Sequence, residues 1–181
     1  MKKTDKILLF EYIVYHLIEW YKKVVSSNQD INKHFSRLTA LKLLFFVSTI
    51  KDTERGNEDL LDIFNKFCAM QYGPVEIDIY TAIVEDKTQL YKFGVHKLIV
   101  NSQDNTIFDS LDSKDKIKVD RAIMLLKSRN PKIISYPASI LINISHKWDA
   151  WQNAMFIASM LGRRSENMPI NSIRENRQIY E

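Results

Sequence analysis

The residues that could carry out hydrolytic chemistry come close together only once in this sequence. Ser145, His146 and Asp149 lie in the stretch SHKWD, where a serine beside a histidine suggests a nucleophile and its general base. Neighbouring residues on a helix point about 100° apart, so we do not expect the Ser145 hydroxyl and the His146 imidazole to share a proton. His146 and Asp149 have the spacing for a capping or orienting hydrogen bond. We therefore predict a structural role for His146.

The other chemistry-bearing residues form no recognisable set. Cys68 is the single cysteine, and its place among apolar residues predicts an inert thiol. The four histidines, at positions 16, 34, 96 and 146, lack the short spacings of zinc ligands. Only 4 glycines are present, with no Walker A or GxGxxG motif that could bind phosphate. We expect no metal, no cofactor and no enzymatic activity; an unrecognised hydrolase is the third-ranked alternative.

Length and composition indicate one globular domain over residues 1–181. The chain is 45% hydrophobic and 27% charged, which is ordinary for a folded protein. Glu11, His16 and Glu19 interrupt the apolar amino-terminal run, so it does not match a secretory signal. No apolar run reaches the roughly 18 residues that span a bilayer. These observations predict a cytoplasmic protein with no membrane partner.

Apolar periodicity predicts a mainly α (α+β) fold, a compact helical bundle with a small β-hairpin. In the first helix, Glu11 and Glu19 are expected on the solvent side, whereas LTALKLLFFVSTI is apolar nearly all round and should lie inside the core. Asp149 is expected to cap the last long helix and Gly162 to end it. The expected helices span residues 5–25, 38–50, 60–68, 113–128, 137–146 and 149–161, with a polar loop over 51–59 and a final short turn from Asn171.

Two further features interrupt the helices. Gly73 is suited to close the helix over 60–68, and Pro74 to open a following helix whose first turn carries Glu76 and Asp78. This predicts a corner between two packed helices. Between residues 89 and 108, β-branched residues flank the polar stretch NSQDN, which predicts a hairpin with its turn at 101–105.

Three stretches, in this order, resemble the Panacea-domain family of antitoxins, which includes SocA-like and phage-associated proteins. LTALKLLFFV (38–47) is similar to the family's L-x-x-x-K-L-L-Y-F helix, and QYGPVEIDIY (71–80) to its Y-G-P-V motif with a later Tyr. SILINISHKWDAWQNA (139–154) is similar to its late Ser/Thr-His and Trp motif, and MPINSIRENR to its final helix. The resemblance covers about residues 8–177.

The resemblance implies that the protein acts by binding. Family members are typically encoded beside a toxin, in type II toxin–antitoxin or phage-related systems, and neutralise it by direct contact. Some relatives also deliver the toxin to a protease. The expected partner is therefore a cognate toxin protein encoded nearby, with a protease or a second copy of the chain as further candidates. The residues that match the motifs, and so are candidates for scaffold or partner contact, are Lys42, Tyr72, Gly73, Pro74, Val75, Tyr80, His146, Trp148 and Trp151.

The alternative is a small nucleic-acid-binding regulator. The net charge is +4, and a weak basic cluster lies near the carboxyl end. Such a regulator would use Arg163, Arg164, Arg174 and Arg177 together with Lys2 and Lys3. The basic residues are otherwise dispersed, and dispersed charge disfavours nucleic acid as the partner.

Overall fold

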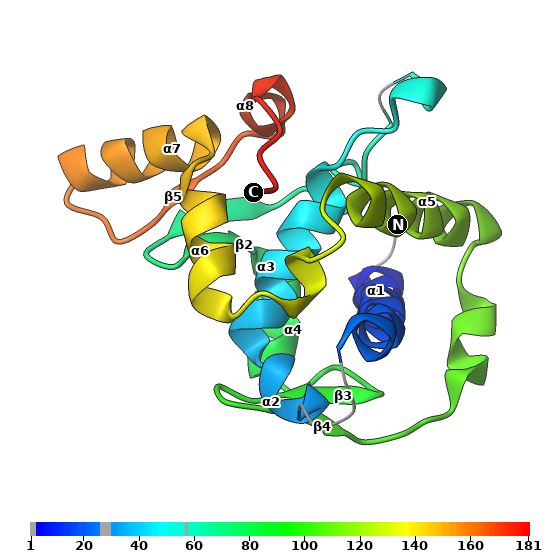
Figure 1. Ribbon diagram of the computed structural model, residues 1–181. Helices are drawn as coiled ribbons and strands as arrows, with labels where there is room; N and C mark the ends of the chain where they lie inside the picture. The colour runs from blue at the N-terminus through cyan, green and yellow to red at the C-terminus, as the bar shows by residue number, and fades with distance from the viewer. Residues whose placement is uncertain (1–2, 26–29, 57) are drawn as a thin grey trace.

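The fold is mainly α-helical with a small antiparallel sheet. The computed structural model describes residues 3–25, 30–56 and 58–181, and side chains from residue 5 onward. Helix α3 (Arg37–Thr49) lies at the centre, between α1 (Lys3–Val24) on one side and α6 (Ala138–His146) on the other (Figure 1). The remaining helices are α2 (Ile31–His34), α4 (Ile77–Val84), α5 (Ser113–Arg129), α7 (Asp149–Met160) and α8 (Ile170–Glu175), with short 3₁₀ turns at Thr53–Arg55, Asn105–Ser110 and Ile133–Ser135.

Helix α3 is central because its sequence offers no face that belongs in water. Every residue from Thr39 to Thr49 is buried, including Lys42. This confirms the core position that its all-round apolar sequence predicts. Phe45 packs edge-on against both Phe67 and Trp148, with ring centroids 5.4 and 4.9 Å apart.

Two antiparallel β elements lean on the helices. The strands β1 (Phe67–Met70), β2 (Gly73–Glu76) and β5 (Glu166–Asn167) form one sheet in the order β2-β1-β5. The second element pairs β3 (Tyr91–Phe93) with β4 (Leu98–Val100). The hairpin predicted between 89 and 108 therefore exists, but its turn lies at residues 94–97 and the stretch 105–110 is a 3₁₀ turn instead of a strand.

The predicted corner at Gly73 and Pro74 is wrong, because these residues turn a β-hairpin. No helix covers 60–68 in the structure; the chain there turns irregularly and then enters β1. Gly73 has φ +96°, the left-handed conformation expected of it, and begins β2 after a two-residue connection. Pro74 lies in β2, an edge strand, where a residue without an N–H is tolerated. A helix does follow, as predicted, but it begins at Ile77 instead of Pro74; Asp78 lies in its first turn, and Glu76 is its N-cap, accepting from the Ile79 N–H at 2.9 Å.

Glu11 was expected on the solvent side of α1 and is instead fully buried. Its carboxylate accepts hydrogen bonds from the main-chain N–H groups of Gln89, Leu90 and Tyr91, at 2.7 to 3.1 Å. Burial raises the pKa of Glu11, and these three donors oppose the rise. The carboxylate thus anchors the start of β3 to the first helix.

The carboxyl-terminal third follows its predicted helices closely. Helices α5, α6 and α7 begin and end within a residue of the expected bounds, and α8 lies where the short final turn was expected, one residue before Asn171 at its start. Gly162 ends α7 with φ +64° as expected, but Asp149 is the first helical residue and Trp148 is the N-cap. Side-chain donors bind main-chain oxygens of the last residues; for example, Trp148 Nε1 donates a hydrogen bond to the Ile179 oxygen at 2.9 Å.

Replacing Gly73 by alanine is expected to destabilise the protein by about 3 kcal/mol, because a Cβ adds overpacking to the strain of positive φ. That Cβ would lie 2.4 Å from Ser145 Oγ and 3.0 Å from Lys42 Cε. Urea unfolding measures the loss. Gly162→Ala is the matched control, because Gly162 also has positive φ but no atom within 4 Å of the added Cβ. It should lose only about 1 kcal/mol; equal losses for the two variants would contradict the close approach at Gly73.

Candidate functional site

Motif residues from three distant stretches meet around the side chain of Lys42. Lys42 lies on α3 and has no exposed surface, and its Nζ donates a hydrogen bond to the Pro74 carbonyl oxygen at 2.7 Å. Burial lowers the pKa of the Lys42 ammonium to about 7. This contact joins the central helix to strand β2.

The third stretch reaches the same place from α6. Ser145 is buried, and its hydroxyl donates to the Ile142 carbonyl at 2.8 Å instead of to a histidine. The side chains of Ser145 and Lys42 both lie so close to Gly73 that a Cβ atom at this position would clash with them. We call the set Lys42, Gly73, Pro74, Ser145, His146 and Trp151 the Lys42 junction.

His146 belongs to the junction through its ring. The imidazole stacks on the Trp151 indole with centroids 3.7 Å apart and planes 9° from parallel, and Trp151 Nε1 donates to the Met70 oxygen at 3.0 Å. Burial lowers the pKa of His146, the nearby Lys42 charge lowers it further, and a hydrogen bond with the Gln71 main chain opposes both. No hydrogen bond links His146 to Asp149 in the described part of the chain. The stack joins the end of α6 to the first turn of α7, and the hydrogen bond from Trp151 to Met70 connects that turn to the β1–β2 hairpin.

The other motif residues lie apart from the junction. Val75 is buried in β2, and Trp148 is fully buried with its ring 5.9 Å from that of Tyr180. Tyr80 is half-buried on α4, with the Arg37 guanidinium 5.6 Å from its ring centroid. Tyr72, at the tip of the hairpin, is 58% exposed. Among the motif residues, Tyr72 thus has the side chain most open to a partner.

The structure reveals a surface that the motifs did not indicate. Helix α7 projects from the body of the molecule (Figure 1), and only one of its sides packs against β1 and β5. The helix and its C-cap residue expose four large apolar residues, which we call the α7 apolar face: Phe156 (66% exposed), Ile157 (48%), Met160 (73%) and Leu161 (56%). Ile157 and Leu161 form the edge of this face nearest β5, where they line a hollow with Glu166 and Asn167. The sequence signal was present in AMFIASML, because a helix that is apolar on two sides cannot bury both against a single sheet.

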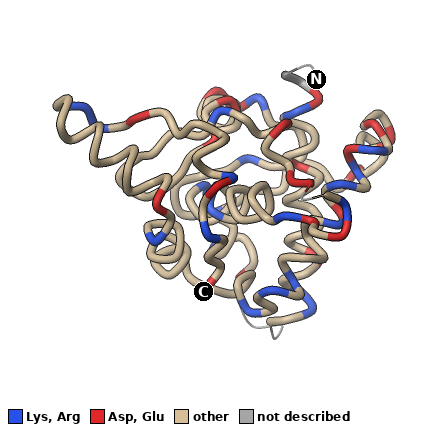
Figure 2. Tube along the Cα trace, turned by 90° about the horizontal axis from the view of Figure 1, so that it is seen from above, with Lys and Arg blue, Asp and Glu red and all other residues tan. Residues whose placement is uncertain are grey.

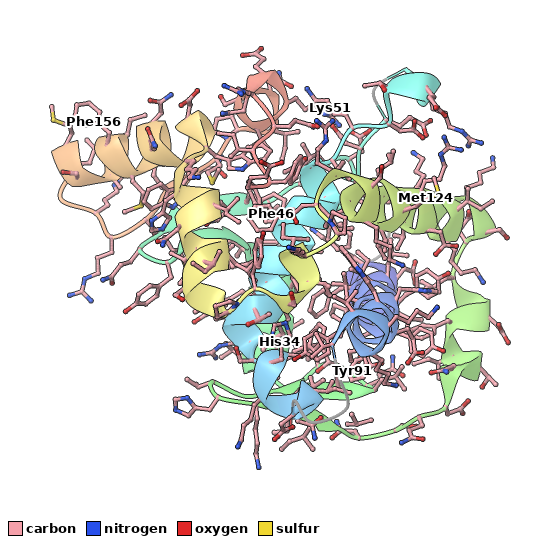
Figure 3. All side chains as sticks on the ribbon, in the orientation of Figure 1. His34, Phe46, Lys51, Tyr91, Met124 and Phe156 are labelled. Atoms are coloured by element: carbon pink, nitrogen blue, oxygen red, sulfur yellow. The ribbon has the colours of Figure 1, made fainter. Side chains whose placement is uncertain are left out.

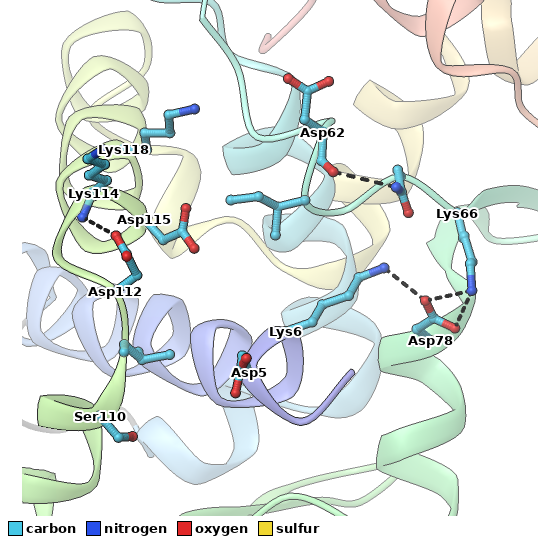
Figure 4. Close-up of a pocket in the computed structure, with 13 residues that line it drawn as sticks. Asp5, Lys6, Asp62, Lys66, Asp78, Ser110, Asp112, Lys114, Asp115 and Lys118 are labelled. Carbon is cyan, nitrogen blue, oxygen red and sulfur yellow. Dashed lines mark hydrogen bonds and ion pairs between the residues drawn. The ribbon is translucent and has the colours of Figure 1, made fainter. Parts of the chain in front are cut away.

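A hollow of about 940 Å³ lies between the beginnings of α1 and α5, the segment 62–66 that leads into β1, and Asp78 in the first turn of α4 (Figure 4). Acidic and basic side chains both line it, and those near the beginnings of α1 and α4 form ion pairs. Asp78, for example, contacts Lys6 at 2.9 Å and Lys66 at 3.1 Å, and Lys6 also reaches Glu76 at 2.5 Å. These ion pairs connect α1 to the start of α4. We therefore assign the charged residues that form them a structural role.

The basic cluster near the carboxyl end is partly neutralised. Arg174 forms two hydrogen bonds of 2.9 Å with Asp59, and Arg163 contacts Glu166 at 3.1 Å. Arg164 and Arg177 are exposed. The predicted contribution of Lys2 and Lys3 rests on side chains outside the described residues.

Comparison with protein-family models, with curated proteins and with solved structures gives no match. The likeness to the Panacea family therefore rests on the motif residues alone. Among the described residues, none of the helices combines the length and hydropathy needed to cross a membrane.

The buried ammonium of Lys42 predicts a specific dependence of stability on pH. Because the folded-state pKa of about 7 lies below the value of 10.5 expected in the unfolded chain, the unfolded state binds an extra proton between these values. Stability should therefore rise with pH in this interval, by up to about 1.4 kcal/mol per pH unit. Urea unfolding of the wild type and of Lys42→Met, from about pH 7.5 to 9.5, measures the difference.

In the variant this contribution should vanish, while the titrations of Cys68 and of the tyrosines, common to both proteins, cancel. Parallel pH profiles for wild type and Lys42→Met would show that the Lys42 ammonium is not desolvated.

Proposed function

We propose that this protein is an antitoxin-type binding protein that neutralises a cognate toxin by direct contact, and that the α7 apolar face makes that contact. The single observation that carries the proposal is this face. Large apolar patches are rare on monomeric proteins and usually mark an interface. The ordered motif residues, five of which meet at the Lys42 junction, support the choice of partner through their resemblance to the Panacea family.

The face has the properties of a binding site for a protein. Helix α7 carries one charged residue, Asp149, and it is drawn almost entirely uncharged in Figure 2, with basic residues beyond its far end. The Phe156 side chain points away from the body of the molecule (Figure 3). Aromatic and methionine side chains are enriched at interface centres, and a standard interface buries about 1,600 Å² in total.

The junction itself favours binding over catalysis. Ser145 and His146 make separate contacts, with a carbonyl and with an indole ring, so they form no nucleophile–base pair. The Lys42 side chain is fully buried beside Gly73 and Pro74, so it has no access to a substrate in solution. These residues hold α7 in place and leave its outer side free for a partner.

Replacing Phe156 and Met160 together by aspartate is expected to abolish neutralisation, because two charges would be desolvated at the centre of the interface. The test co-expresses each form with the product of the neighbouring gene in bacteria and scores growth and co-purification. Wild type should rescue growth and hold the partner, and the double variant should lose at least about 100-fold in affinity, the effect of losing two anchor residues.

Met124→Asp is the matched control, because Met124 is an apolar residue that is 54% exposed on a different helix, α5 (Figure 3). It should rescue growth like the wild type. A Phe156→Asp/Met160→Asp protein that still rescues growth would show that the toxin binds elsewhere. A wild type that neither rescues growth nor co-purifies with the neighbouring product would remove the antitoxin proposal itself.

A further inference from the structure

A second hollow, separate from the α7 apolar face, carries an unbalanced positive charge. It measures about 610 Å³ and lies where the end of α5, the turn after it and α6 meet residue 181. Its cations are Arg129, Lys132 and Lys147, and the single acidic residue in its lining is Glu181. We call it the basic hollow. Small-molecule sites usually have volumes of about 300–1,000 Å³.

In the part of the chain that the structure describes, the three cations lack side-chain carboxylate partners of the kind that Lys6 and Lys66 have in the hollow of Figure 4. Within the described residues, none of them forms an ion pair with a carboxylate side chain, whereas the lysines facing Asp78 are paired. Lys147 Nζ donates to the main-chain oxygen of Glu181 at 2.9 Å. The Lys147 ammonium group therefore already binds one oxygen acceptor, and its remaining N–H donors could bind a second acceptor from a ligand.

Lys132 is the most informative of the three. Arg129 ends α5 and Lys147 caps α6, so both also complement helix dipoles. Lys132 lies beyond α5 and completes neither of these helices. Its main chain is fixed, because its N–H donates to Asn130 Oδ1 at 3.1 Å and Asn130 Nδ2 donates to the Tyr180 oxygen at 2.7 Å. The turn therefore presents Lys132 from a rigid base.

The uncharged residues of the lining could contact the organic part of an anionic ligand. Tyr136, Ile140 and Ile144 supply aromatic and aliphatic surface, and the exposed Asn143 brings an amide that can both donate and accept. A guanidinium with two ammonium groups suits a phosphate dianion, and an aromatic ring suits a planar base. We propose that the basic hollow binds a small phosphorylated ligand of the nucleoside monophosphate class, with its phosphate among Arg129, Lys132 and Lys147.

Titration calorimetry of the full chain with adenosine monophosphate tests this site, with inorganic phosphate and adenosine as separate arms. The monophosphate should bind at least about tenfold more tightly than either fragment, because charged and stacking contacts each contribute on the order of 1–3 kcal/mol. Lys132→Glu should weaken binding at least about tenfold. Glu181→Gln should strengthen it about two- to threefold, because it removes the one acidic side chain of the lining.

Lys114→Glu is the control, because Lys114 lies 15 residues before Arg129 on α5, about 22 Å along the helix. It should leave the affinity within about twofold, and the unfolding midpoints of the variants report that each is folded. The proposal is overturned if the wild type does not bind the monophosphate at about 1 mM. It is also overturned if phosphate or adenosine binds equally well, or if Lys114→Glu and Lys132→Glu weaken binding alike.

Discussion

The burial of the Lys42 side chain is the constraint on which the arrangement of the other elements depends. An ammonium group removed from water requires acceptors, and the main chain of the β1–β2 hairpin supplies one through the Pro74 carbonyl. That hairpin can approach closely enough only because Gly73 has no side chain, and the same approach brings Ser145 of α6 into contact. One buried cation thereby joins the central helix, the small sheet and α6.

The position of α7 follows from this junction. Helix α6 ends at His146, whose ring stacks on Trp151 in the first turn of α7, and Trp151 is in turn bonded to the hairpin at Met70. The helix is fastened at its beginning, and its later turns extend away from the body with apolar side chains on the outer side. A rigid base with an unpaired apolar end is the arrangement expected of a protein that presents one surface to a partner.

Local patterns were sufficient for most of the helices, because the apolar faces that each helix buries are encoded within its own segment. The periodicity in α1, α5 and α7 and the all-round apolar character of α3 predicted those elements, because each pattern reflects the faces that the helix buries. The stretch from Leu60 to Cys68 misled because its apolar spacing also fits a helix. Its strand, β1, pairs with β2 through a tight turn and with the distant β5, and the pairing with β5 lies outside any local window of sequence. Glu11 was misplaced for the same reason, since its partners lie about 80 residues away.

Part of the candidate site could likewise be predicted from the sequence, and part could not. The motif resemblance brought Lys42, Gly73, Pro74, His146 and Trp151 onto one list, and the structure brings these five together. Their common role is visible only in three dimensions, because it depends on contacts between segments about 30 and 80 residues apart. The α7 apolar face escaped notice because apolar residues on a predicted helix are assigned to the core by default. Only the packed structure shows which side remains uncovered.

Amide hydrogen exchange of the chain, alone and mixed with the product of the neighbouring gene, tests most directly whether the α7 apolar face binds the partner. Binding should slow exchange over Asp149–Met160, and most strongly beyond Ala154, while the exposed side of α5 around Met124 exchanges as before. Protection confined to other elements, with α7 unchanged in the complex, would contradict the assignment of the α7 apolar face as the docking surface.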